Sequence, residues 1–135
     1  MPVRDAESFG DIRALLPDGA KTREQESLLS LDAETLTVRN RDTGAVIKTV
    51  PYRAVQALTY SQSRRPRASE RTDIAPLPAA FGGSGFFLKT AKHWLTLQSR
   101  ADFLILRLED KNVRGVLSSI EARVGFKADR PRDDK

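Results

Sequence analysis

Three consecutive segments decide the predicted fold: HWLTLQ at 93–98, FLILRL at 103–108 and DKNVRGVLSSIEARV at 110–124. The first two show the period-2 alternation of β-strands, and residues 99–102 form a short connection between them. Phe103 and Ile105 lie on the opposite face of their strand from Leu104 and Leu106. We therefore expect an antiparallel hairpin whose second strand is buried on both faces.

The third segment is predicted to be an amphipathic helix over residues 110–124. Asp110 is a good N-cap, and Gly125 suits the left-handed position that ends many helices. The expected buried face has the spacing i, i+3, i+4, i+7, i+11, and it consists of Val113, Val116, Leu117, Ile120 and Val124. The expected solvent face consists of Lys111, Arg114, Glu121 and Arg123.

Five further strands are predicted before this hairpin. They cover residues 26–31, 35–40, 45–50, 54–61 and 86–90. The first four follow one another through short turns, so we expect an antiparallel meander and not a βαβ arrangement. With 93–98 and 103–108, the prediction is a mainly β protein of seven strands and one C-terminal helix.

The two ends of the chain are predicted to lie outside this domain. Residues 1–21 are expected to be an N-terminal extension, in which Ile12, Leu15 and Leu16 have the spacing of a short helical turn. Residues 126–135 are charged and are expected to be a disordered tail. The domain itself is therefore placed at residues 22–125.

The order of these elements resembles the pleckstrin-homology-like (PH-like) fold, in which a helix caps a seven-stranded antiparallel barrel or orthogonal sandwich. Val50-Pro51-Tyr52-Arg53-Ala54-Val55 is similar to the Ile-Pro-x-x-x-Ile strand entry of bacterial PH-like and GRAM-like domains. The resemblance implies a binding or scaffold domain of the bacterial type. Many eukaryotic members bind phosphoinositides with basic residues at the first hairpin loop. Here that loop is expected at Asp32–Glu34, which is acidic, so this mode of binding is not expected.

Composition indicates an ordinary soluble domain. The 135 residues contain no cysteine, which excludes disulfides and thiolate metal sites. No apolar run approaches the roughly 20 residues of a membrane-spanning helix. The N-terminus lacks the apolar core of a signal peptide, so we expect a cytoplasmic location. The net charge of +5 favours acidic partners weakly, and plain solubility is the preferred explanation over nucleic-acid or anionic-lipid binding.

The sequence predicts no enzyme, no cofactor and no metal site. The single histidine, His93, has no serine or carboxylate near it in the chain with which to form a catalytic dyad, so we interpret it and Trp94 as scaffold. Residues 81–85 (FGGSG) superficially resemble a phosphate loop. They lack the following Lys-Ser/Thr and precede a strand, so that interpretation is rejected.

Residues 62–85 break the pattern of strands and are predicted to form a long surface loop rich in arginine, proline and glycine. Ile74, Leu77 and Phe81 are candidates to anchor this loop on the barrel. The candidate residues for binding an anion or a partner are Arg64, Arg65, Arg67 and Arg71.

The predicted function is a non-catalytic interaction module. A protein or peptide partner would use an exposed strand edge or the groove between helix and sheet. The alternative is peripheral binding of an anionic membrane lipid or a nucleic acid through the arginines of the loop. A ligand barrel of the lipocalin type is disfavoured, because seven short strands leave an interior that side chains fill.

Overall fold

The structure, a computed structural model, describes residues 7–18, 21–69, 71, 73–74, 77, 88–100 and 102–131. Seven strands, a 3-10 turn and an α-helix make up the described chain. In order they are β1 (Glu7–Asp18), β2 (Lys21–Leu31), β3 (Thr35–Asn40), β4 (Val46–Pro51), η1 (Tyr52–Ala54), β5 (Ala57–Ser63), β6 (Lys92–Gln98), β7 (Phe103–Leu108) and α2 (Val113–Val124).

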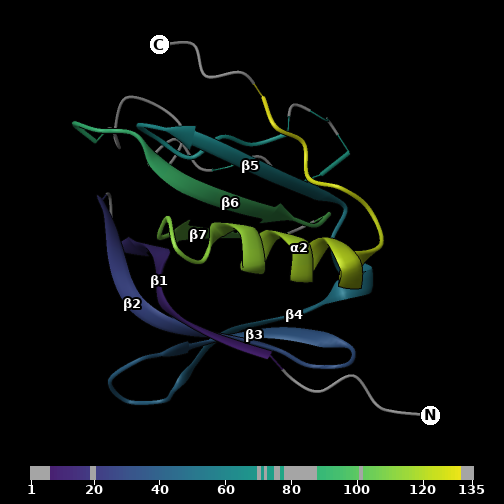
Figure 1. Cartoon of the computed structure of the whole chain (residues 1–135), viewed down its shortest axis with the longest axis horizontal. Coiled ribbons are helices and arrows are strands. Elements are labelled where there is room, and N and C mark those ends of the chain that lie inside the picture. Colours follow the sequence, from purple (N-terminus) through teal and green to yellow (C-terminus); the bar gives the residue numbers. More distant parts are fainter. Residues whose placement is uncertain are drawn as a thin grey trace.

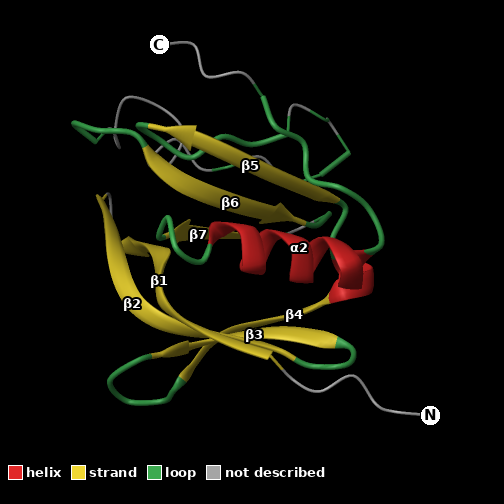
Figure 2. Ribbon diagram, in the orientation of Figure 1, coloured by secondary structure: helices red, strands yellow, loops and turns green. Residues whose placement is uncertain are grey.

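The strands form one antiparallel sheet with the order β4-β3-β2-β1-β7-β6-β5. The sheet curls into a half-barrel, and α2 lies in its opening between the half that contains β3 and β4 and the half that contains β5 and β6 (Figure 1). Figure 2 shows α2 in red between the two halves of the sheet. The predicted fold class, mainly β with seven antiparallel strands and one C-terminal helix, is confirmed.

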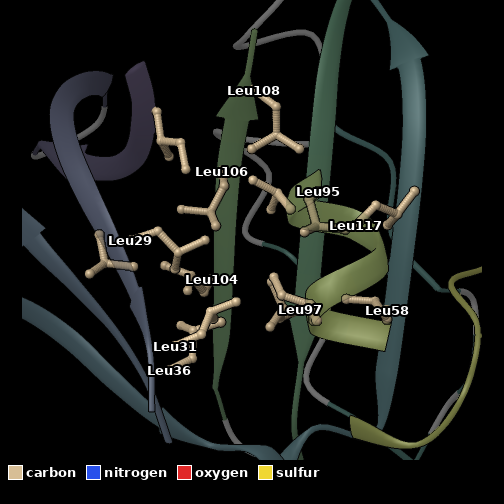
Figure 3. Packing of buried hydrophobic residues seen from close by; sticks show 14 of the residues in the cluster. Leu29, Leu31, Leu36, Leu58, Leu95, Leu97, Leu104, Leu106, Leu108 and Leu117 are labelled. Carbon is tan, nitrogen blue, oxygen red and sulfur yellow. The ribbon is translucent and has the colours of Figure 1, made fainter. Parts of the chain in front are cut away.

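Two hydrophobic clusters lie on the two faces of the sheet. The main cluster fills the inside of the half-barrel, where leucines from both halves of the sheet and Leu117 of α2 point toward one another (Figure 3). A smaller cluster on the outer face joins Leu15, Trp94 and Ile105, with Leu77 and Leu88 packed against it. The expectation that 103–108 is buried on both faces is therefore confirmed.

The helical turn predicted in residues 1–21 is wrong. Residues 7–18 form β1, an interior strand that pairs with β2 along its length and with β7 at Arg13 and Ala14. Ile12 and Ala14 enter the main cluster while Leu15 enters the outer one, so apolar residues serve both faces of a strand. A bulge between Phe9 and Ile12, with Asp11 at a φ of 55°, bends β1 so that it serves both halves of the sheet.

The count of seven strands is right, although its members differ from the prediction. Residues 88–90 are not a strand, and residues 81–87, including Phe81 and the FGGSG motif, lie outside the described residues. Because β1 precedes β2, Asp32–Glu34 connects the second strand to the third and is not the first hairpin loop. The first turn contains residues 19–20, which lie outside the described residues.

The meander is confirmed for β2, β3 and β4, and it stops there. Pro51 ends β4, Tyr52–Ala54 form η1, and Val55 is buried with its N–H donating to the carbonyl of Tyr52. This reversal leads the chain away, so that β5 pairs with β6 and not with β4. The proline, which cannot donate to a strand ladder, marks the point where the chain changes from one half of the sheet to the other.

Helix α2 begins three residues later than predicted. Its N-cap is Asn112, while the side chain of Asp110 contacts His93. Gly125 does end the helix in the left-handed region, with a φ of 91°. Glu121 and Arg123 were expected on the solvent side, but their side chains are only 10 % and 6 % exposed. Glu7 of β1 forms an ion pair with Arg123. The Ala128 N–H and the Arg130 side chain contact Glu121.

Residues 126–131, predicted as part of a disordered tail, pack against the domain. Asp129 forms a parallel bridge with Thr59 of β5, and Ala128 is 8 % exposed within the main cluster. The expected boundary at 21/22 falls inside β2, and the one at 125/126 separates α2 from the segment that forms the bridge to β5. Residues 132–135 lie outside the described residues.

Candidate functional site

The two edges of the half-barrel differ in what covers them. The edge of β5 carries the bridge from Asp129. The edge of β4 that faces away from β3 pairs with no strand in the described residues. Unpaired N–H and C=O groups along an edge are a template for another extended chain. The first candidate for a binding site is therefore the edge of β4.

A small apolar pocket adjoins this edge. It lies between the end of β4 with η1 and the turn that joins β6 to β7, and it has a volume of about 90 Å³. Its lining includes Thr49, Val50, Ala54, Leu97 and Leu104. Small-molecule sites usually measure ~300–1,000 Å³. The pocket therefore suits one aliphatic side chain better than a cofactor or metabolite.

An ion pair spans the gap beside the pocket. Lys48 Nζ lies 2.7 Å from Asp102 Oδ1 and donates to the carbonyl of Phe103 at 3.1 Å. Burial raises the pKa of Asp102, but the hydrogen bond from Lys48, the Phe103 N–H and the charge of Lys48 together hold it below its usual value. Lys48 and Asp102 thus tie β4 to the β6–β7 turn where no strand pairing does so among the described residues.

The structure gives the four candidate arginines different roles. Arg71 donates to both carboxylate oxygens of Asp73, at 3.0 and 2.5 Å, and to the carbonyl of Gln56 at 2.7 Å. Its pKa is raised, first by its hydrogen bonds to Asp73 and then by the charge of Asp73. Arg71 therefore fastens the loop to the start of β5.

The other three arginines lie nearer to β5. The carbonyl of Arg65 accepts from Ser63 Oγ, and that of Arg64 accepts from the Leu88 N–H. Arg67 is half-buried and lines a polar hollow of about 370 Å³ together with Thr59, Ser69, Asp129 and Arg130. Ile74 is buried and Leu77 packs on the outer cluster, so the loop is anchored as expected at these two residues.

A hydrogen-bonded chain of Tyr60, His93 and Asp110 was missed at the sequence level. His93 Nδ1 lies 2.7 Å from the hydroxyl of Tyr60, and its Nε2 contacts Asp110 Oδ1. The sequence showed no serine or carboxylate near His93 in the chain, and the carboxylate that contacts it, Asp110, is 17 residues away. No local motif joins these residues, because the strand register brings them together.

The chemistry of this chain favours a structural role. Burial raises the pKa of Tyr60, which disfavours a phenolate at neutral pH. His93 joins β5, β6 and the residue before the turn into α2, and its side chain is 15 % exposed. We therefore continue to interpret His93 as a scaffold residue, whose side chain is held by Tyr60 and Asp110.

In the described part of the chain, no three His, Cys, Asp or Glu side chains are grouped so that they could hold a metal ion. None of its helices has the length and apolar character needed to cross a membrane.

Comparisons with known proteins give a likeness of fold. No family model matches the chain, and no curated protein does. A solved structure described as the heterodimer of Spt16D and Pob3N contains a chain that matches with a TM-score of 0.57 at 10 % identity. The match covers 100 % of this chain and 57 % of that one, so this chain spans little more than half the length of its structural neighbour. The likeness supports the PH-like fold predicted from the order of elements.

Proposed function

We propose that this chain is a non-catalytic PH-like interaction module that binds an extended segment of a partner protein along β4. The observation that carries the proposal is an open strand edge beside an apolar pocket. In β-strand addition, main-chain hydrogen bonds supply affinity, and pockets for alternate side chains supply specificity. Here the edge of β4 would supply the main-chain hydrogen bonds, and the pocket would select one side chain of the partner.

The chemistry of the surface defines the partner segment. Val46, 52 % exposed, lies at the start of β4, and Thr49 and Val50 near its end line the pocket. A partner strand of five or six residues spans this distance at ~3.3 Å per residue. It would carry an aliphatic side chain at the position that faces the pocket, because the pocket is small and its lining is mainly apolar.

The structural neighbour is consistent with a protein partner. Its description names a heterodimer, and the likeness to that structure is one of fold. The alternative from the sequence, an anionic lipid or nucleic acid bound by the arginines, has less support. One of the four arginines, Arg71, is already engaged with Asp73 and with the backbone.

The experiment compares one partner across matched variants. The full chain is immobilised, proteins captured from a lysate of its own cell are identified, and the purified partner is titrated by calorimetry. Thr49→Lys places a charge at the edge and pocket, and Ala54→Leu fills the pocket. Each should weaken the Kd at least about tenfold, ~1.4 kcal/mol.

Thr90→Lys is the matched control, because it makes the same substitution at an exposed residue. Thr90 precedes the start of β6, whereas the pocket lies at the end of that strand. It should leave the Kd within about twofold, a change well under ~1.4 kcal/mol. The proposal is overturned if both β4 variants bind as the wild type does. It is also overturned if binding is lost in the Arg64→Ser, Arg65→Ser, Arg67→Ser triple variant and falls steeply between about 50 and 200 mM salt, as polyanion binding does.

A further inference from the structure

The segment that follows α2 occupies part of the other sheet edge. After Gly125 the chain turns back and runs beside β5 (Figure 1). The Tyr60 N–H donates to the carbonyl of Asp129 at 2.8 Å, and the Asp129 N–H donates to the carbonyl of Leu58 at 2.8 Å. Asp129 is thus a one-residue parallel extension of the sheet.

Side chains hold the segment on both sides of this bridge. The Ala128 N–H donates to Glu121 Oε2 at 2.7 Å, and the Ala128 side chain reaches the main cluster. The Arg130 guanidinium lies 3.7 Å from the same carboxylate oxygen and 5.7 Å from the centre of the Tyr60 ring. A small residue followed by an acidic one is therefore the pattern that this edge accepts.

The charge around Asp129 explains why a carboxylate lies there. A parallel bridge places the side chains of Asp129 and Thr59 on the same face of the sheet. On that face both residues line the hollow of about 370 Å³ that Arg67 also lines. Asp129 is close enough to add to the raised pKa of Arg71, after the larger effects of Asp73. Two of the four arginines predicted as partner-binding residues, Arg67 and Arg71, thus lie near an acidic side chain of the chain itself.

Within the part of the chain that the structure describes, this segment pairs with only part of the β5 edge. The bridge uses Leu58 and Tyr60, two residues of a seven-residue strand. Thr59 is 2 % exposed, and its Oγ1 has no hydrogen-bond partner among the described residues although Thr59 lines the hollow. A longer strand would make more backbone hydrogen bonds, and a bound acidic side chain could accept from this hydroxyl.

We propose that β5 is a second docking edge, that it binds an extended segment of a partner protein in which a small residue precedes an acidic one, and that residues 126–131 are a built-in occupant which such a segment displaces. The proposal concerns the edge opposite β4 and stands or falls separately from the proposed function. The built-in occupant is held at the high effective concentration of an intramolecular contact, so it excludes weak or badly matched strands.

The test uses the full chain and a peptide with the sequence of residues 126–131, followed by nuclear magnetic resonance. Asp129→Pro removes the N–H that donates to Leu58 and should release the segment. The exchange rate of the Tyr60 amide, which loses its acceptor, should rise at least about tenfold. The added peptide should then bind at least about tenfold more tightly to the variant than to the wild type, and should restore the Tyr60 amide signal.

A second variant and a second peptide guard the interpretation. Arg130→Glu places a carboxylate beside Glu121 and should release the segment without altering Ala128 or the backbone. This variant replaces Asp129→Pro in the experiment if Asp129→Pro does not fold. A peptide with Lys in place of Asp should bind at least about tenfold more weakly, because it sets a cation against Arg67 and Arg71.

Three results would overturn the proposal. One is equal affinity of the wild type and the released variants for the peptide. Another is a Lys-containing peptide that binds as tightly as the Asp-containing one. The third is concentration-dependent dimerisation of Arg130→Glu with no peptide binding, which would make a second copy of this chain the occupant of the edge.

Discussion

Lys48 and Asp102 show how one ion pair responds to acid. The pKa of Asp102 is lowered in the folded protein, because the Lys48 hydrogen bond, the Phe103 N–H and the Lys48 charge outweigh the effect of burial. A carboxyl group whose folded pKa is depressed stabilises the fold above its unfolded pKa of ~3.9. This stabilisation is lost as the pH falls through the lower folded value.

We predict that Asp102→Asn lowers the free energy of unfolding at neutral pH by about 0.2–1 kcal/mol, the range of exposed ion pairs. Asparagine keeps the oxygen that accepts from the Phe103 N–H, so the change isolates the charge. Urea unfolding of both proteins at pH 7, 5 and 3 checks this. The difference should be intact at pH 5 and should shrink toward zero below about pH 4. A difference unchanged at pH 3 would show that the charge is not its source.

Single residues were the hardest part of the candidate sites to predict. Arg67, Arg71 and Leu77 were identified from composition and pattern alone. The partners Asp73, Asp129 and Arg130 were not, since their roles depend on where the loop and the final segment lie. Tyr60 and His93 are 33 residues apart in the chain and meet because β5 and β6 are in a particular register.

At the scale of elements, the start of α2 shows a choice between two candidate caps. Asp110 has the better residue type for an N-cap, yet its side chain is 93 % exposed and reaches His93. Asn112 instead accepts from the Glu109 N–H at 3.0 Å and donates to the carbonyl of Gly10 at 3.0 Å. It thereby fixes the first turn of the helix to the bulge of β1.

We predict that Asn112→Ala lowers the free energy of unfolding by about 0.5–1.5 kcal/mol, because two hydrogen-bonded backbone groups lose their partner. Asp110→Ala should lower it by less than about 0.5 kcal/mol, as is usual for surface changes. Chemical denaturation followed by circular dichroism measures both. The reverse order would mean that the sequence-based choice of Asp110 as cap was right and that Asn112 is incidental.

The apolar face of α2 was predictable because periodicity reports burial directly. Val116, Leu117 and Ile120 are all buried. The flank of the helix was not predictable. Arg123 donates to Glu7 at 2.8 Å, and these residues are 116 positions apart, so the helix sequence contains no sign of the contact.

For the molecule as a whole, the decisive fact is that β1 lies in the middle of the sheet. It separates β2 from β7 in the strand order and joins the two halves. Its apolar residues have the spacing i, i+3, i+4 because the strand is bulged and buried on both faces. That spacing is equally typical of a helical face. The sequence therefore sufficed for the number of strands and the fold class, while the identity of one strand depended on pairing with residues far along the chain.

We predict that Ile12→Ala lowers the free energy of unfolding by about 2–5 kcal/mol, as for other fully buried aliphatic residues. Ile12 is 1 % exposed, whereas Val46 is 52 % exposed. Val46→Ala is the matched control and should cost less than about 0.5 kcal/mol. Urea denaturation of the three proteins provides the comparison. If Ile12→Ala lowered the free energy of unfolding as little as the control does, residues 1–21 would be an extension of the domain and not part of its core.

The half-barrel is closed on its two sides by different chemistry. Helix α2 closes one side with buried apolar side chains, and Lys48 and Asp102 span the other with an ion pair whose carboxylate is 59 % exposed. Salt screens exposed charges over ~8 Å at physiological ionic strength and leaves apolar packing in place. The two sides therefore respond differently to salt. Raising the ionic strength should weaken the tie between β4 and the β6–β7 turn, whereas the packing of α2 should stay in place.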